Sequence, residues 1–314
     1  MPHAASPREQ RPQTRLGGEG MGYGRSVRRV CFYHAGCPDG FGAAWALWRA
    51  WGASASYIPR GHDDVVRPGR HKGALVVFAD IATDNDTLRT LGEEAGKLIV
   101  LDHHVSALRR FEAEPGLADG LRSRGHVIHF DLSHSGAILA WMYFHPDVPP
   151  PDLLRYVEDQ DLWRFALPAS EEVNAAITSH PRTFEAWEAL VKTPIEKLAS
   201  DGESIVRANR MDIEHTLHNA HPICLDELRL EAVNSVHLRS RLGHELASRA
   251  ACGVPCGAVY RILGHRVNVS IYSIGEFDVA ELAARFGGGG HRNAAGFNVS
   301  LAEWLERFVP VERE

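Results

Sequence analysis

The apolar run 98–101 (Leu-Ile-Val-Leu) is followed directly by Asp102-His103-His104, and this junction most constrains how the chain folds. Four consecutive apolar residues are typical of a short buried strand in a parallel sheet. Polar side chains directly after such a strand lie at the carboxyl edge of the sheet, where open α/β folds bind their ligands. Because two imidazoles and a carboxylate are costly to bury without a partner, the tripeptide predicts a divalent metal site.

Similar apolar runs recur through the first half of the chain and alternate with helical patterns. We expect strands at 30–33, 57–58, 74–79, 98–101 and 127–130. Helical patterns lie between them, notably at 40–51, 85–95 and 135–144. Strands that alternate with helices predict an α/β fold, in which an N-terminal doubly wound parallel sheet carries helices on both faces.

The second half of the chain begins with helices and then returns to a mixed pattern. Helical patterns dominate 152–218. Four aromatic residues of this part are expected to fill a core: Trp163, Phe165, Phe184 and Trp187. Strand-like runs follow at 256–262 and 267–272, and a helix then begins at the N-cap Asp278, with Glu281 three residues later. These patterns predict a smaller C-terminal α/β domain.

The expected domain boundaries follow these changes in pattern. Residues 1–27 mix Pro, Arg, Gln and Gly without periodicity and are expected to be disordered, with Met21 as an alternative start. Residues 28–195 are expected to form the domain that carries the tripeptide, 196–225 a helical linker and 226–314 the C-terminal domain.

Charge and cysteine content exclude several classes of protein. The formal net charge of −6 provides no overall basic surface for a long nucleic acid. No stretch approaches the roughly 18 to 20 apolar residues that span a membrane, and the N-terminus lacks the apolar core of a secretory signal. The five cysteines are scattered, which argues against a disulfide framework. We expect a cytoplasmic protein that binds neither long duplex nucleic acid nor a membrane, with homodimer formation left open.

Ligand-type side chains also follow two other predicted strands. His34 and Asp39 come after the first strand, and Asp80 ends the third. The carboxyl ends of parallel strands meet at one edge of the sheet, so these side chains should converge on the tripeptide. Oxygen and nitrogen ligands favour manganese or magnesium over structural zinc. Several carboxylates at one edge would repel one another, which favours two metal ions over one.

These motifs resemble, in order, those of the DHH phosphoesterase superfamily. The segment from His34 to Gly40 is similar to the first motif, Asp80 to the second, Asp102-His103-His104 to the third and residues 158–163 to the fourth. Residues 286–297 (Phe-Gly-Gly-Gly-Gly-His-Arg-Asn-Ala-Ala-Gly-Phe) resemble the glycine-rich signature of the DHH-associated C-terminal domain. The resemblance covers residues 29 to about 300, with all motifs in order.

The resemblance implies a centre of two manganese ions, with magnesium as the alternative, and a role for each matched residue. Asp80 would bridge both ions and His34 would bind one of them. The other ion would be bound by Asp39, His103 and a carboxylate of the fourth motif, either Asp161 or its rival Asp159. Asp102 would orient the histidines, and His104 would face the phosphate as an acid or an electrostatic stabiliser.

The chain departs from the family pattern at two places. Cys37 stands where many relatives carry an aspartate, so it either weakens the first metal site or serves only as a tight-turn residue. The strand before the capped helix reads Ser270-Ile271-Tyr272-Ser273, where nucleic-acid-degrading relatives often have an arginine. Tyr272 is therefore expected to stack on a base instead.

The glycine run is expected to contact the substrate. Without Cβ atoms, Gly288, Gly289 and Gly290 can approach an anion closely and offer amide groups to phosphate oxygens. The alternative is a helix C-cap followed by a turn. Arg292 would pair with a phosphate, and His291 would supply a donor near the scissile group.

The function implied by the resemblance is that of a manganese-dependent phosphoesterase. It would hydrolyse phosphodiester or phosphomonoester bonds of short nucleotides or oligonucleotides, as an oligoribonuclease or exonuclease does, through a hydroxide activated by two metal ions. One alternative is a hydrolase of inorganic pyrophosphate or polyphosphate. The other is a nucleotide-binding protein with weakened catalysis, for which Cys37 is the reason.

Overall fold

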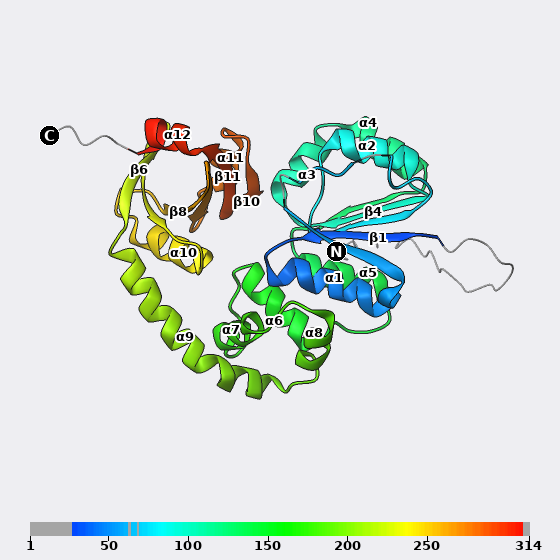
Figure 1. Ribbon diagram of the computed structural model, residues 1–314, viewed down its shortest axis with the longest axis horizontal. Coiled ribbons are helices and arrows are strands. Elements are labelled where there is room, and N and C mark those ends of the chain that lie inside the picture. Colours follow the sequence, from blue (N-terminus) through cyan, green and yellow to red (C-terminus); the bar gives the residue numbers. More distant parts are fainter. Residues whose placement is uncertain (1–26, 62–63, 68, 310–314) are drawn as a thin grey trace, which may run out of the picture.

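The computed structural model describes residues 27–61, 64–67 and 69–309. The segment expected to be disordered and the alternative start at Met21 lie outside the described residues, except for Val27. The chain builds two sheets that lie beside each other in Figure 1, and a group of helices with a long connecting helix runs below them from one to the other.

The first sheet has five strands, all parallel, in the order β2-β1-β3-β4-β5. Their bounds are β1 Arg29–His34, β2 Ala55–Arg60, β3 Leu75–Ala79, β4 Lys97–Asp102 and β5 Val127–Phe130. The central strands β3 and β4 bury nearly every side chain, as strands covered on both faces do. All five predicted strands are confirmed.

Helices cover both faces of this sheet, so the predicted doubly wound α/β fold is confirmed. Figure 1 shows α1 (Pro38–Trp51) and α5 (Gly136–Phe144) on one face. The other face carries α2 (Asn85–Glu94), α3 (Val105–Glu112) and α4 (Pro115–Ser123). A 3₁₀ turn at Gly52–Ser54 joins α1 to β2.

A group of helices extends the face that carries α1. These are α6 (Asp152–Asp161), α7 (Ser170–Ser179) and α8 (Phe184–Leu190). Trp187 is 1% exposed and packs against Phe41 and Trp45 of α1, with Phe184 stacked on Phe41. The predicted core position of these two aromatic residues is confirmed, whereas Trp163 and Phe165 lie in a loop outside this core.

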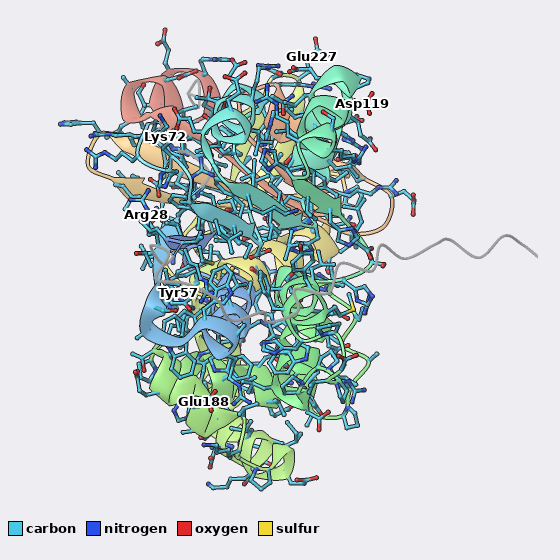
Figure 2. All side chains as sticks on the ribbon, turned by 90° about the vertical axis from the view of Figure 1, so that its right-hand side faces the viewer. Arg28, Tyr57, Lys72, Asp119, Glu188 and Glu227 are labelled. Atoms are coloured by element: carbon cyan, nitrogen blue, oxygen red, sulfur yellow. The ribbon has the colours of Figure 1, made fainter. Side chains whose placement is uncertain are left out.

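The long helix α9 (Ile195–Leu217) packs along α7 and leads to the second sheet (Figure 1). It covers most of the segment predicted as a linker, but the last residues of that segment form the strand β6 (His221–Leu225). Among the described residues, no helix is both long and apolar enough to cross a membrane. Glu188 of α8 and Glu227, which follows β6, lie at opposite ends of the molecule (Figure 2).

The second sheet has six strands in the order β10-β11-β9-β8-β7-β6, and only β7 and β8 are parallel to each other. The remaining bounds are β7 Leu228–Asn234, β8 Cys256–Leu263, β9 Arg266–Ser273, β10 Gly289–His291 and β11 Ala294–Ser300. One face packs on α11 (Val279–Ala284), α12 (Leu301–Glu303) and a π-helical turn at Trp304–Phe308. The other face packs on α10 (Arg239–Arg249). The predicted C-terminal α/β domain is confirmed.

We predict that Trp187→Ala lowers the free energy of unfolding by about 3–5 kcal/mol, because a fully buried indole is lost and a cavity remains. The change is measured by urea denaturation. Met211→Ala on α9, where the side chain is 58% exposed, is the matched control and should change the same quantity by about 0.5 kcal/mol or less. Equal denaturation midpoints for the two variants would contradict this account of the core.

Candidate metal centre

Three adjacent strands of the first sheet deliver polar side chains to one edge. His34 is the last residue of β1, Asp80 follows β3, and His103 follows β4. Because β1, β3 and β4 are neighbouring parallel strands, their carboxyl ends lie side by side. The convergence predicted from the strand ends is therefore present.

Asp80 occupies the centre of this edge in an unusual backbone conformation. Its φ is 60°, in the left-handed region that non-glycine residues rarely adopt, and its N–H donates to Leu101 O at 2.9 Å. Gly136 at the start of α5 packs directly against it, since a Cβ there would lie 2.2 Å from Asp80 Cβ. The surrounding backbone therefore holds Asp80 in this uncommon conformation at the edge of the sheet.

The carboxylate of Asp80 faces two separate histidines. Its Oδ2 lies 3.3 Å from His34 Nδ1, and its Oδ1 lies 2.9 Å from His103 Nε2. One carboxylate thus spans two groups of ligand-type side chains. That is the geometry required of a residue that bridges two cations.

The first group consists of His34, Cys37 and Asp80. Cys37 Sγ lies 3.5 Å from His34 Nδ1 and 3.6 Å from Asp80 Oδ2. The same sulfur accepts a hydrogen bond from Gly40 N–H at 3.2 Å and so caps α1. Cys37 therefore caps α1 and also faces this group, while its effect on a metal ion there stays a prediction. Burial raises the pKa of its thiol, which favours the neutral form.

The second group consists of Asp39, His103 and Asp161. His103 Nε2 lies 3.5 Å from Asp39 Oδ2 and 3.5 Å from Asp161 Oδ2. The Asp39 carboxylate also accepts hydrogen bonds from the N–H groups of Gly136 (2.7 Å) and Ala137 (2.9 Å) at the start of α5. The helix N-terminus thus stabilises its negative charge and fixes its direction.

The residues of both groups fit a divalent cation. Asp80 Oδ1 and Asp161 Oδ2 are buried, face His103 Nε2, and yet have no hydrogen-bond partner of acceptable geometry. These oxygen atoms lie close to the nitrogen but do not form hydrogen bonds with it. A divalent cation bound between them would satisfy all three atoms. The donor set of carboxylates and imidazoles suits manganese or magnesium.

The pKa values of this cluster reflect its crowded charges. Burial and the neighbouring charges of Asp80 and Asp161 raise the pKa of Asp39 well above its usual value. Burial alone would raise the pKa of Asp80, but His103 and His34 lower it well below its usual value. Burial alone would lower the pKa of His103, but Asp80, Asp161 and Asp39 raise it to about 10. Protons on the histidines therefore balance the carboxylates, and bound cations would displace those protons.

Asp102 holds the two histidines that follow it. It is fully buried, and its Oδ1 accepts hydrogen bonds from the backbone N–H of His103 at 2.8 Å and of His104 at 3.3 Å. The same oxygen lies 2.7 Å from His104 Nδ1. The bond to the ring places the proton of neutral His104 on Nδ1, as the predicted orienting role requires. Asp102 contacts His103 only through the backbone N–H of His103.

The second sheet adds His291 to this centre. Its ring centroid lies 4.6 Å from that of His103 and 4.3 Å from that of His104, on which it stacks at 24°. Burial and the nearby charges of His104 and His103 lower the pKa of His291 well below its usual value, so the ring is neutral. The ring therefore lies beside the tripeptide, and its role as a donor near the scissile group stays a prediction.

Two amide groups of the glycine run, which were predicted to bind a phosphate, are hydrogen bonded within the protein instead. The N–H of Gly288 donates to Ala283 O at 2.9 Å, and the N–H of Gly290 donates to Ser106 Oγ at 2.9 Å. A Cβ at Gly289 would lie 2.8 Å from Ser106 Oγ. The expectation that these amides bind a phosphate is therefore wrong for Gly288 and Gly290. The glycines let β10 approach α3.

Three other predicted site residues lie away from the two groups. Arg292 donates a hydrogen bond to Glu276 O at 2.8 Å and pairs with the exposed carboxylate of the same residue, so its contact with a phosphate stays a prediction. Tyr272 is 8% exposed and packs in the apolar cluster beneath α10, so it offers no face to a base. Asp159 accepts hydrogen bonds from the N–H groups of Ala166 (2.9 Å) and Leu167 (3.2 Å), which leaves Asp161 alone of the two beside His103.

Sequence reasoning missed the contacts that join the two sheets. Ser106 is the first, and its hydroxyl anchors β10 beside the tripeptide. The loop with Trp163 and Phe165 is the second. The Trp163 ring stacks on His244 of α10 with ring centroids 4.8 Å apart, and Arg241 Cζ lies 4.8 Å from the centroid of the Phe165 ring. Trp163 and Phe165 have φ values of 53° and 45°, so this loop turns them out of the core in which they were expected.

Known proteins share parts of this organisation. The family model of the DHHA1 domain matches residues 246–311. The chain is 26% identical over 292 residues to the uncharacterized protein R106 of Acanthamoeba polyphaga mimivirus, with 86% of this chain and 67% of that protein covered.

Solved structures are similar over most of the chain. The DHH domain of a member of a ribosomal protein family superposes with a TM-score of 0.51 at 15% identity, covering 88% of this chain and 84% of that one. The pGpG-specific phosphodiesterase PggH from Vibrio cholerae superposes with a TM-score of 0.37 at 10% identity, covering 88% and 94%.

The DHHA1 match covers most of the second sheet, including β10, which brings His291 to the centre. The superposition with a DHH domain supports the fold around the first sheet. Within that sheet, Asp102-His103-His104 stands at the end of β4, in order with the other ligand motifs. Residues 246–311 of the chain therefore match the DHHA1 domain, and the chain shares its fold with a DHH domain of known structure.

Proposed function

We propose that the chain is a phosphoesterase that depends on two divalent cations, manganese by preference, and acts on short nucleotides. The observation that carries this proposal is the Asp80 carboxylate, which lies 3.3 Å from His34 and 2.9 Å from His103 with different oxygens. A carboxylate shared between two ligand groups is the arrangement that two-metal phosphoesterases use. His34, Asp80, Asp39, His103 and Asp161 would hold the cations.

Cations bound there would stabilise the nonbridging phosphate oxygens and lower the pKa of the attacking water. The residues of the chain position the phosphate and handle its protons. Asp102 fixes His104 with the proton on Nδ1, so a proton exchanged with the substrate would be carried by Nε2. His291 stacks on His104 and, being neutral, can donate one hydrogen bond without adding positive charge.

Two features support a short substrate. The contact of Gly290 N–H with Ser106 Oγ and the ion pair of Arg109 with Asp278 at 3.0 Å join α3 to the second sheet beside the ligands. These two contacts lie on one side of the ligands, and a short substrate needs no passage through that side. The net charge of −6 also provides no overall attraction for a long nucleic acid.

A substrate panel tests this proposal. The protein is incubated with manganese and a 5′-phosphorylated dinucleotide, a 3′,5′-bisphosphonucleoside, a cyclic dinucleotide, pyrophosphate or tripolyphosphate. We expect nucleoside monophosphate or phosphate to be released from at least one nucleotide, and no release after treatment with EDTA. Hydrolysis of the inorganic compounds alone would overturn the choice of nucleotides, and no hydrolysis of any compound would favour a binding protein.

The two acidic residues of the fourth motif give a matched pair of variants. We predict that Asp161→Asn lowers kcat/KM at least about a hundredfold, because it removes a charged ligand beside His103. Asp159→Asn should instead lower the unfolding temperature, because its carboxylate holds the loop at Ala166 and Leu167. Steady-state kinetics and thermal denaturation measure the two effects. The reverse assignment would contradict this ligand set.

We predict that one substitution at Cys37 strengthens manganese binding. We expect Cys37→Asp to bind the weaker of two manganese ions about tenfold more tightly or better, because a carboxylate replaces a neutral thiol beside His34 and Asp80. Aspartate also caps helices well, so α1 should be preserved. Isothermal titration with manganese measures the change, and Cys37→Ser serves as the uncharged control. Equal affinities in Cys37→Asp and Cys37→Ser would count against a cation beside residue 37.

A further inference from the structure

The first ligand group contains a cysteine, which distinguishes it from the second group. Among the groups of potential metal ligands in the described residues, only that of His34, Cys37 and Asp80 includes a thiol. The second group offers carboxylates and an imidazole alone. Thiolates are soft ligands that select zinc, whereas manganese and magnesium prefer carboxylate oxygens. The two groups therefore differ in the cation that their atoms suit.

The distances within the first group match those of a tetrahedral zinc site. Cys37 Sγ lies 3.5 Å from His34 Nδ1 and 3.6 Å from Asp80 Oδ2, and the latter two atoms are 3.3 Å apart. With ordinary zinc–ligand bonds, two corners of a tetrahedron are about 3.6 Å apart for sulfur and nitrogen, about 3.6 Å for sulfur and oxygen and about 3.4 Å for nitrogen and oxygen. The same bonds at right angles, as in an octahedral site, would bring each pair to about 3 Å. The three side chains therefore need little movement to bind zinc.

Three protein ligands are the number found at catalytic zinc sites. Such sites leave a fourth position for water or substrate, whereas structural zinc sites use four protein ligands. His34 and Cys37 are partly exposed, so a cation can reach them from the solvent. Asp80 joins this group to the second one through its other oxygen, which lies 2.9 Å from His103 Nε2. The first group is therefore of the open kind that a catalytic centre requires.

The start of α1 prepares Cys37 to bind a cation. Cys37 is the N-cap residue of this helix, and its sulfur accepts a hydrogen bond from Gly40 N–H at 3.2 Å. A helix N-terminus stabilises negative charge, so it favours the thiolate that zinc binds. A Cβ at Gly40 would lie 2.1 Å from His34 O, so glycine is needed for α1 to begin this close to the end of β1. The same turn thus brings His34 and Cys37 together.

We propose that the first group binds zinc, held by the thiolate of Cys37 together with His34 and Asp80, while the second group binds manganese or magnesium. The proposal rests on the proposed function and specifies its cofactors, because a mixed pair of cations takes the place of two like ions. The thiol proton passes to the solvent as the zinc–sulfur bond forms. Without zinc, manganese fills both groups but binds the first one more weakly.

Cobalt(II) tests the thiolate ligand directly, because cobalt replaces zinc and its bond to a thiolate gives a charge-transfer absorption band in the near ultraviolet. The full-length protein is freed of metal with a chelator and titrated with cobalt(II) in the presence of a thiol-free reductant. We expect the wild type to develop this band and Cys37→Ser to lack it. Cys252→Ser, which removes another half-buried cysteine, is the matched control and should keep the band. No band in the wild type, or an equal band in Cys37→Ser, would overturn the proposal.

The affinity for zinc provides a second readout. Sites of nitrogen and oxygen also bind zinc more tightly than manganese, so the comparison is made between variants for each metal. In competition with a chromophoric chelator, Cys37→Ser should bind zinc at least about tenfold more weakly than the wild type at one site. Its affinity for manganese, measured by calorimetry, should stay near that of the wild type. Serine is a good N-cap, so α1 is retained. An equal loss of affinity for both metals would contradict zinc selectivity.

Neither measurement requires hydrolysis, so failure of this proposal can be distinguished from failure of the proposed function. If nucleotides are hydrolysed with manganese but cobalt gives no thiolate band, the zinc site is wrong and the proposed function stands. If no substrate is hydrolysed but the band depends on Cys37, the proposed function fails and the zinc site stands.

Discussion

The position of the Asp80 carboxylate between His34 and His103 is the constraint on which the rest of the site depends. The residue lies in the left-handed region, with φ of 60°, and Gly136 packs against it where no side chain would fit. The backbone of α5 also directs Asp39 through two N–H groups. The contact between the start of α5 and the end of β3 therefore fixes the positions of two carboxylates, those of Asp80 and Asp39. Buried carboxylates gathered in this way repel one another, and divalent cations are the natural compensation.

The centre is completed by the second sheet rather than by the first alone. His291 stacks on His104 because Gly290 is hydrogen bonded to Ser106 and because the neighbouring glycines allow β10 to approach α3. Trp163 provides a separate contact with α10. Two contacts far apart in the sequence thus fix the polar face of the second sheet over the ligands. Movement of one sheet relative to the other would displace His291 from the site, which links substrate access to the contacts between them.

The sequence predicted the parts of this molecule that follow from strand ends. Apolar runs mark the five parallel strands, and neighbouring parallel strands must bring His34, Asp80 and His103 to one edge. Resemblance to a family added Asp161 and His291, which lie far along the chain. Sequence spacing could not decide whether Asp159 or Asp161 is the ligand. The choice depends on which carboxylate accepts hydrogen bonds from the N–H groups of Ala166 and Leu167, and that is Asp159.

The incorrect expectations concern partners that only the folded chain supplies. The N–H of Gly290 was expected to bind a phosphate, but it donates to Ser106 Oγ, 184 positions earlier in the chain. Tyr272 was expected to meet a base, but the alternation of β9 directs it beneath α10. Residues 270–273 carry no arginine, but Arg239 of α10 donates a hydrogen bond to Ser270 Oγ, a contact that a search along the strand could not find.

The central claim is that Asp80 joins two cation sites, and anomalous X-ray diffraction from crystals soaked in manganese tests it most directly. The account predicts two anomalous peaks about 3.5–4 Å apart, both within bonding distance of Asp80. One peak should lie beside His34, and the other beside Asp39, His103 and Asp161. A single peak, or two peaks of which only one touches Asp80, would contradict the account.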